Sequence, residues 1–409
     1  MKTITKTKFK QTEMGMIPED WEVKKLSDLT VKITKGTTPT TVGGKFVEKG
    51  INFIKVESLK EDGTIHKEKL MHIDVKTDEM LARSRLQKND LLYSIAGTIG
   101  RVSIVNEDIL PANTNQAIAI LRPDINKINL LYLRYALVNP ELKNYLLSKV
   151  VHAVQANLSL TEISNCPVPF PSDEEEQRAI AKILSDLDSK IELNQQVNKT
   201  VEAIGQALFK HWFIDLEEIP EGWETKHLDE IAGFLNGLAL QKYTAKEGEA
   251  YLPAIKIREL RSGITEQTDK VSLNLPKEYI VEDGDILFSW SGSLEVVIWT
   301  NGKGALNQHL FKVASKEYPK WFYYYWTKHH LPNFRRIAEG KATTMGHIQK
   351  HDLSESEVLV PDKRALDKMD CLMNPILKKI IALNLETHNL AKIRDLLLPK
   401  LMSGEIRVK

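Results

Sequence analysis

Few combinations of side chains in this sequence are suited to catalysis. Pro123-Asp124 followed by Glu141 to Lys143 fits the loose pattern PD…(D/E)xK, in which two carboxylates hold Mg²⁺ for nuclease chemistry. The pattern arises often by chance, and here Glu141 directly follows Pro140 in a stretch with helical character. We therefore do not expect a nuclease.

Other catalytic signatures are incomplete or missing. His347 and His351 in "HIQKH" are four residues apart and can share a helix face, but the general-base glutamate of an HExxH zinc site is lacking. The sequence contains no glycine-rich cofactor loop after a strand, no Asn-Pro-Pro-aromatic motif and no G-x-x-x-x-G-K-[ST] loop. We expect no catalytic residue and no metal site, which argues against a methyltransferase or an ATPase.

A second kind of chemistry to consider is DNA contact by polar and basic side chains in loops. DNA recognition requires groups that hold phosphates and groups that hydrogen-bond base edges. Glycine-bearing loops such as "VKITKGTTPTTVGGK" and "SIAGTIGR" present lysines and hydroxyls that can approach a DNA backbone closely. The candidate DNA contacts are Lys32, Lys35, Thr37, Thr38, Lys45, Lys55, Ser94, Thr98, Arg101, Asn115 and Gln116 in the first half, and Lys256, Arg258, Ser289, Ser291, Ser293, Asn307 and Gln308 in the second.

The two Asn-Gln pairs allow two interpretations. Asn115-Gln116 and Asn307-Gln308 can each hydrogen-bond adenine with two bonds. Their presence in both halves favours a structural or phosphate-binding role instead, because halves that read different sequences need not share their reading residues. The aromatic run "WFYYYW" suggests base stacking, but its alignment with "LLYLRY" favours the core side of a helix.

Bulk composition neither identifies nor excludes a DNA-binding protein. The 409 residues include 56 basic and 55 acidic side chains, for a formal charge of +1, so any basic surface has to come from clustering. Cys166 and Cys371 are far apart, which is typical of a reduced, cytoplasmic protein. The N-terminal stretch lacks an apolar segment and no run reaches 18 apolar residues, so we expect neither a signal peptide nor a membrane span.

The elements that position these residues are duplicated. "IPEDWEVKKL" begins at Ile17 and returns as "IPEGWETKHL" at Ile219, with seven of ten positions identical. "NDLLYSIAGTIG" matches "GDILFSWSGSLE", "ANTNQ" matches "GALNQ", and "KIELNQQ" matches "KIIALNLE", all in the same order. Collinear matches of this kind indicate an internal repeat that spans the whole chain.

Each copy has β-favouring runs separated by turn signals, then a short helical stretch interrupted by Pro140 or Pro332, then a long helix. We expect an α+β fold of two tandem mixed recognition domains, each followed by a long helix. The expected segments are a basic N-terminal arm over 1–15, domains over 16–171 and 217–361, a central spacer helix over 172–216, and a C-terminal spacer helix with its tail over 362–409.

The first long helix has the clearer pattern. Ser172 and Glu175 predict an S-x-x-E capping box at its start. The apolar stripe predicted to face a second helix consists of Ile180, Ile183, Leu184, Leu187, Ile191, Val197, Val201, Ile204 and Leu208. Asn194 interrupts this stripe and aligns with Asn384, so both are candidates for fixing the register of an antiparallel coiled coil. In the second helix the stripe includes Ile393, and Pro375 predicts a kink or a new helix start.

The order of these features resembles the DNA-specificity subunit of type I restriction–modification systems. The residues that carry the resemblance are the repeated "IP.GW" openings, "EEEQRAIAKIL", "LFKHWF" and the ending "LLLPKLMSGEIRV", so that it covers the chain from about Met16 to Val408. The weak second helix opening, "DKRALDKMD", departs from the pattern.

The resemblance implies that each domain reads one half of a bipartite, asymmetric site in double-stranded DNA. It further implies that the helices act as a spacer and dock two methyltransferase subunits, and that restriction–translocase subunits join the same complex. S-adenosylmethionine, ATP and Mg²⁺ would then belong to the partner subunits, and this chain would be non-catalytic. The alternative is a non-catalytic coiled-coil adaptor with two protein-binding domains, which the near-neutral charge leaves open.

Overall fold

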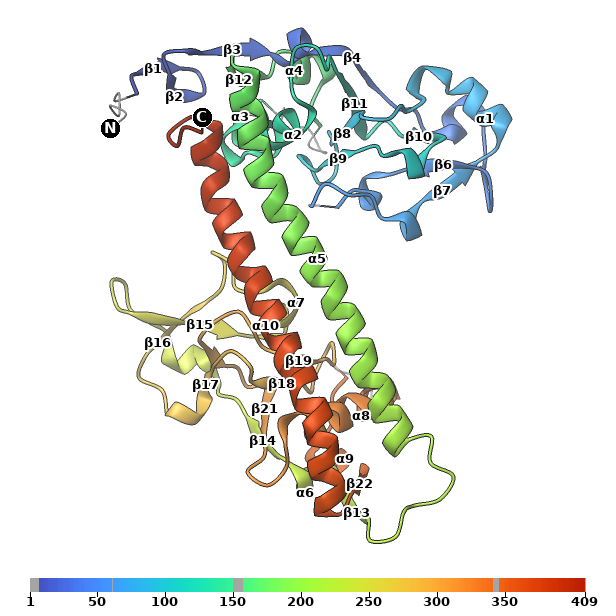
Figure 1. The fold of residues 1–409 in the computed structure, drawn as a ribbon, viewed down its shortest axis with the longest axis vertical. Helices are drawn as coiled ribbons and strands as arrows, with labels where there is room; N and C mark the ends of the chain where they lie inside the picture. Colours follow the sequence, from blue (N-terminus) through green and yellow to red (C-terminus); the bar gives the residue numbers. More distant parts are fainter. Residues whose placement is uncertain (1–6, 61, 150–156, 341–345, 409) are drawn as a thin grey trace. The chain divides into compact units, whose positions relative to one another are not determined.

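The computed structural model describes residues 7–60, 62–149, 157–340 and 346–408 (Figure 1). The chain forms two compact units. Unit 1 comprises Met1–Ser189 and Ala391–Lys409, and unit 2 comprises Lys190–Leu390. Within the described residues, no helix is both long and apolar enough to cross a membrane.

Unit 1 is built on a four-stranded antiparallel sheet and a smaller mixed sheet. The first has the strand order β4-β11-β8-β9 and the second β10-β6-β7-β5, in which β10 and β6 are parallel. Two further pairs are β1-β2 and β12-β3. The strands are β1 (Phe9–Thr12), β2 (Gly15–Pro18), β3 (Trp21–Lys25), β4 (Thr30–Lys35), β5 (Phe46–Val47), β6 (Ile51–Ile54), β7 (Met71–Ile73), β8 (Leu91–Ser94), β9 (Val102–Ile104), β10 (Ala112–Thr114), β11 (Ile118–Pro123) and β12 (Pro167–Pro171).

Unit 2 repeats this plan. Its antiparallel sheet has the order β14-β21-β18-β19, its mixed sheet the order β16-β15-β20-β17 with β15 and β20 parallel, and β13 pairs with β22 as β3 pairs with β12. The strands are β13 (Glu224–His227), β14 (Gly233–Asn236), β15 (Tyr251–Ile255), β16 (Lys270–Ser272), β17 (Ile280–Val281), β18 (Ile286–Ser289), β19 (Val296–Ile298), β20 (Gly304–Leu306), β21 (Leu310–Ala314) and β22 (Glu357–Val360). The predicted duplicated α+β fold is confirmed.

Helices cover the antiparallel sheet of each unit. Besides two long helices, the described α-helices are α1 (Val75–Met80), α2 (Leu130–Val138), α3 (Pro140–Ser148), α4 (Leu160–Ser164), α6 (Leu228–Ile231), α7 (Ile257–Ser262), α8 (Lys320–Gly340) and α9 (Lys350–Ser354). The aromatic run in α8, Trp321 to Trp326, is buried, so the prediction of helix core is confirmed. Every position of β8 and β18 is buried beneath this helical layer.

Proline interrupts only one of the two equivalent helical stretches. Pro140 is the first residue of α3, where its missing N–H costs nothing, so that α2 and α3 are separate helices. Pro332 instead lies within α8, which continues to Gly340, and the predicted interruption there is wrong. Pro332 is on the exposed side of α8, where water can satisfy the carbonyl that proline leaves without a partner.

The two long helices are α5 (Glu174–Phe213) and α10 (Lys363–Met402), drawn green and red in Figure 1. The predicted capping box is wrong by one residue: Asp173 precedes the first turn of α5, and its Oδ1 accepts a hydrogen bond from the backbone N–H of Glu175 at 3.0 Å. Asp362 caps α10 in the same way through the N–H of Ala365. The predicted restart of α10 at Pro375 is also wrong, because the helix runs through this exposed proline.

Within each unit the helices run antiparallel, as predicted. In unit 1 Asp188 of α5 pairs with Arg394 of α10 at 2.9 Å. In unit 2 Asn198 donates to Asn384 at 3.0 Å, and further along α5, Gly205 lies against Ile376, an earlier residue of α10.

The predicted stripe holds for most positions of the long helices. Ile204 and Ile393, however, are 49% and 46% exposed. Gly205 is buried in place of Ile204, because the packed position of α5 has moved by one residue. Asn194 is 2% exposed, and no described residue accepts a hydrogen bond from its Nδ2. Its role in register remains a prediction.

Candidate nucleic-acid interface

The tight turns after β8 and β18 are held by buried serines. The hydroxyl of Ser94 donates to the carbonyl of Thr98 at 2.6 Å and accepts from the N–H of Arg101 at 2.8 Å. Ser289 makes the same pair of bonds, donating to the carbonyl of Ser293 at 2.6 Å and accepting from the N–H of Glu295 at 2.8 Å. Both hydroxyls are buried and used within the turn. We therefore leave Ser94 and Ser289 out of the candidate interface.

The asparagines of the two Asn-Gln pairs build a loop. The Oδ1 atom of Asn115 accepts from the N–H of Ala117 at 3.2 Å, and that of Asn307 accepts from the N–H of His309 at 3.3 Å. This side-chain-to-backbone bond two residues ahead is the Asx-turn pattern. The asparagine of each pair therefore has a structural role in its loop. The side chain of the glutamine next to it takes no part in this turn.

A glycine that we did not single out from the sequence brings two loops together in each unit. A Cβ on Gly36 would overlap the carbonyl of Thr114, and a Cβ on Gly237 would overlap the carbonyl of Asn307. Gly36 follows β4 and Gly237 follows β14. Because only glycine permits this approach, the end of the first strand lies directly against the Asn-Gln loop in both copies.

In unit 1 this junction gathers several predicted residues. The hydroxyl of Thr38 donates to Oε1 of Gln116, and Nζ of Lys32 donates to the carbonyl of Arg83 at 2.7 Å. An Nη2–H of Arg83 reaches Oγ1 of Thr37 at 3.5 Å. Lys35 is the last residue of β4, immediately before Gly36. Arg83 is exposed and was not found from the sequence, because nothing local links it to this loop.

The parallel strand pairs add one lysine each to the same edge. Ile54 of β6 is opposite Thr114 of β10, so Lys55 follows directly beside Asn115. In unit 2, Ile255 of β15 is opposite Leu306 of β20, and Lys256 follows beside Asn307. Parallel strands end at a common edge, which explains how residues far apart in sequence meet there.

In unit 2 the junction carries aromatic and amide side chains. The indole Nε1–H of Trp290 donates to Oδ1 of Asn236 at 3.0 Å, and its ring centroid is 5.8 Å from that of His309. Oγ of Ser291 lies 3.0 Å from Nδ1 of His309. Nε2 of Gln308 lies 3.4 Å from Nε2 of His309. Of these residues only Ser291 and Gln308 were predicted.

Several other predicted cations are engaged with neighbours. Lys256 pairs with Asp269, while Arg258 forms an ion pair at 2.8 Å with Glu259, whose side chain is 1% exposed. The ammonium of Lys55 lies over the ring of Phe46 at 5.0 Å. Nζ of Lys45 is 3.8 Å from Asp74.

At the turns, an Nη1–H of Arg101 donates to the carbonyl of Leu59 at 3.3 Å, and Oγ of Ser293 accepts from Arg261. Thr98 is exposed at the tip of its turn. Of these three residues, Thr98 is therefore the most accessible to a partner.

The rival chemical sites find no geometric support. Among the described residues, no group of three or more His, Cys, Asp or Glu side chains is arranged to hold a metal ion. His351 pairs with Glu355 at 3.0 Å, and the ring of His347 lies 6.3 Å from that of Trp290. Asp124, from the nuclease-like pattern, pairs with Lys127 at 3.3 Å.

Comparison with known proteins places this geometry in a family. The model of the type I restriction modification DNA specificity domain matches residues 18–203 and again residues 220–394. The chain belongs to this family. It carries two copies of the specificity domain, which correspond to the two halves of the repeat.

The chain is similar to named relatives over nearly its full length. It is 28% identical to the type I restriction enzyme MjaIX specificity subunit of Methanocaldococcus jannaschii, over 98% of this chain and 97% of that protein. It is 23% identical to the HindI specificity subunit of Haemophilus influenzae, over 84% and 93%. Its fold is similar to the crystal structure of a type I restriction–modification S subunit from M. genitalium, with a TM-score of 0.57, 17% identity, and 97% and 99% coverage.

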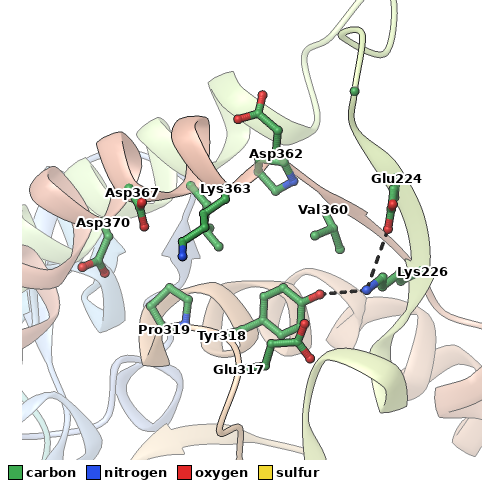
Figure 2. Close-up of a pocket in the computed structure, with 13 residues that line it drawn as sticks. Glu224, Lys226, Glu317, Tyr318, Pro319, Val360, Asp362, Lys363, Asp367 and Asp370 are labelled. Atoms are coloured by element: carbon green, nitrogen blue, oxygen red, sulfur yellow. Dashed lines mark hydrogen bonds and ion pairs between the residues drawn. The ribbon is translucent and has the colours of Figure 1, made fainter.

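The second specificity domain has a groove that is unsuited to DNA phosphates. It has a volume of about 730 Å³, and Figure 2 shows its carboxylates and its two lysines, Lys226 and Lys363. Nζ of Lys226 is 3.0 Å from the hydroxyl of Tyr318 and 3.8 Å from Glu224, and the bond to Tyr318 is the main reason why the pKa of Lys226 is raised. The acidic residues of its lining are Glu224, Glu317, Asp362, Asp367 and Asp370. Their excess over lysine disfavours a polyanion here.

At the corresponding place in the first specificity domain, two carboxylates bind Arg407 of the C-terminal tail. Arg407 donates to both carboxylate oxygens of Glu176, at 2.6 and 2.9 Å, and to both of Asp20, at 2.9 and 2.7 Å. The residue aligned with Asp20 in the second copy is Gly222, which lines the acidic groove. In the first copy, Arg407 therefore neutralises the carboxylates at this place, whereas acidic residues outnumber lysines in the groove of the second copy.

Proposed function

We propose that this chain is the DNA-reading subunit of a type I restriction–modification complex. Each specificity domain binds one half of a split, asymmetric target in double-stranded DNA. Helices α5 and α10 dock two methyltransferase subunits and set the distance between the half-sites, and restriction–translocase subunits join the same assembly. The chain itself is non-catalytic, and S-adenosylmethionine, ATP and Mg²⁺ are used by its partners.

One observation carries the DNA-reading part of this proposal. The loop junction is built by the same contacts in both copies: the serine turn, the Asn loop and the glycine contact. The side chains at the edge of the junction differ, with the half-buried Lys35 in one copy where the exposed Asn236 stands in the other. A constant scaffold with a variable edge is what two readers of different half-sites require.

The partner part of the proposal rests on the relatives and on the repeat. Proteins similar over the full length of this chain are named specificity subunits of type I restriction enzymes. Two equivalent helices of 40 residues offer two equivalent docking positions. An enzyme that needs two copies of one methyltransferase subunit can therefore use the same contact twice.

Methylation mapping tests the whole proposal. The chain is co-expressed with the methyltransferase subunit encoded beside it, and methylated positions in the cellular DNA are mapped. The expected result is a split motif with unlike halves that disappears when this chain is omitted. A stable complex that methylates no defined motif would contradict the DNA-reading function and leave the adaptor as the better interpretation.

A salt titration separates the two functions directly. Binding to DNA through phosphates releases counterions, so affinity should fall by about a thousandfold or more between 50 and 200 mM salt if six or more phosphates are contacted. An adaptor with no DNA role would not bind DNA measurably even at 50 mM salt.

A further inference from the structure

The shared glutamines of the two Asn-Gln loops present different hydrogen-bonding groups. In the first domain, Oε1 of Gln116 already accepts a hydrogen bond from the hydroxyl of Thr38. In the second domain, no described residue donates to Oε1 of Gln308, and only its Nε2 has a neighbour, Nε2 of His309 at 3.4 Å. Gln116 therefore presents free N–H donors beside an oxygen with one of its two lone pairs already used, whereas Gln308 presents an oxygen with both lone pairs unused by described residues beside an N–H donor.

One cause of this difference is the residue at a single aligned position. Gly36 and Gly237 hold the same place in the two copies, so Thr38 aligns with Ala239. Alanine has no hydroxyl to occupy the glutamine oxygen. Ala239 therefore leaves the oxygen of Gln308 available, while Thr38 engages that of Gln116.

The residues around Gln308 are themselves positioned by side-chain contacts. His309 is fixed by the 3.0 Å contact with Ser291 and lies beside the ring of Trp290. Trp290 is fixed in turn by its 3.0 Å bond to Asn236. A reading side chain that is already oriented loses less conformational entropy on binding and discriminates more sharply between bases.

We propose that Gln308 reads an adenine in the major groove for the second domain, whereas Gln116, with its oxygen held by Thr38, reads a base that presents only acceptors. This inference rests on the proposed function, since it assigns the bases that the two domains contact. Adenine presents N7 as an acceptor and N6 as a donor, which match the N–H and Oε1 of one amide. Guanine presents N7 and O6, both acceptors, which match the amide donors that Gln116 retains.

Asn-Gln pairs that are present in both domains can in this way still contribute to different sequence specificities. The asparagine of each pair builds the loop, and the glutamine is set by its neighbour. Trp290, Ser291 and His309 stand where the first domain has Ile95, Ala96 and Ala117, so the surroundings differ as well.

The test uses two substitutions and one matched control in the full chain, co-expressed with the methyltransferase subunit. Gln308→Ala removes the reading amide, and Thr38→Ala frees the oxygen of Gln116. Gln267→Ala removes an exposed glutamine of unit 2 that lies outside the loop junction. Methylated motifs are mapped for each, and binding of the purified complexes is measured on duplexes that carry each base pair at each position of the motif.

We expect Gln308→Ala to lower discrimination about tenfold or more at one adenine of one half-site, as is usual for the loss of a two-bond base contact. Thr38→Ala should change the preference at one position of the other half-site, with adenine gaining over guanine. Gln267→Ala should leave both half-sites unchanged.

Three results would overturn the proposal. These are unchanged discrimination in Gln308→Ala, an affinity loss in this variant that is uniform over all sequences, or Thr38→Ala acting on the same half-site as Gln308→Ala. A wild-type complex without any split motif would refute the proposed function instead, so the two failures are distinguishable.

Discussion

Replacing Arg407 with alanine should destabilise unit 1 and leave unit 2 unchanged. The guanidinium donates to all four carboxylate oxygens of Glu176 and Asp20. It also lies 5.9 Å from the centre of the Trp21 ring. These two carboxylates raise the pKa of Arg407 above its usual value, which means that the folded state favours its charged form.

The size of the effect follows from burial. The side chain of Glu176 is only 5% exposed, so alanine at position 407 leaves its charge buried with one remaining donor, the indole N–H of Trp21 at 3.1 Å. Loss of one partner from a buried ion pair typically costs about 3–5 kcal/mol. Asp20 is 63% exposed and water replaces its partner, so it adds little. We expect a loss of about 3 kcal/mol in the free energy of unfolding of unit 1.

Hydrogen exchange measured by mass spectrometry can resolve the two units. Amides of β3 and β12 in unit 1 should exchange faster in Arg407→Ala, and those of β13 and β22 in unit 2 should not. Lys400→Ala is the matched control, because the Lys400–Glu405 pair is 46% and 61% exposed and is expected to contribute at most about 1 kcal/mol. Equal effects of both substitutions, or faster exchange in both units, would refute the reasoning. In the double variant Arg407→Ala/Glu176→Ala, the loss should be smaller than the sum of the two single losses, because no buried charge is left without a partner.

Three further perturbations give distinct results. Burial lowers the pKa of His330 to about 4 from 6.5, so the unfolded chain binds the extra proton between these values and stability falls as the pH drops. Unit 2 should lose about 2 kcal/mol between pH 7 and pH 5 in chemical unfolding, and His330→Phe should flatten this part of the profile. Gly205→Ala should lower the unfolding free energy by about 1–2 kcal/mol, because its Cβ would overlap the Tyr325 hydroxyl. Adding Tyr325→Phe should restore much of the loss. A double variant no more stable than Gly205→Ala alone would contradict this reasoning. Inserting four residues near Asn194, with four opposite them in α10, lengthens each helix by about 6 Å and should widen the gap between half-sites by about one or two base pairs. An unchanged gap in an assembled, active complex would argue against the spacer role.

The sequence predicted the repeated parts of the fold well, because they are specified by local and periodic signals. The buried positions of α5 recur at helical spacing, and the Asn115 and Asn307 turns occur in matched surroundings. The errors came from positions where two adjacent residues both suit the local pattern. Asp173 rather than Ser172 caps α5. Gly205 rather than Ile204 faces the core, and the hydroxyl of Tyr325 occupies the space that a larger side chain at position 205 would need.

The candidate site was only partly predictable for a related reason. Thr37, Thr38 and Gln116 were found because they are polar residues in loops. Arg83 and Trp290 were not, since neither is marked by its neighbours in sequence. They reach the junction through the strand order and through the contact that Gly36 and Gly237 permit. A cross-strand arrangement of this kind is not encoded in any short motif.

The comparison of the two copies also limits what residue identity can tell about function. Matching Asn-Gln pairs argued for a common role, yet the asparagine of each pair builds a loop, and the glutamine of the first pair accepts a hydrogen bond from Thr38, where the second copy has Ala239. A change at a single supporting position can therefore alter the group that an unchanged residue presents to DNA. In a duplicated reader this allows the half-sites to diverge while the buried turns and the glycine contact stay constant. Residues that support a reading side chain should then vary between relatives with different targets as much as the reading side chains themselves do.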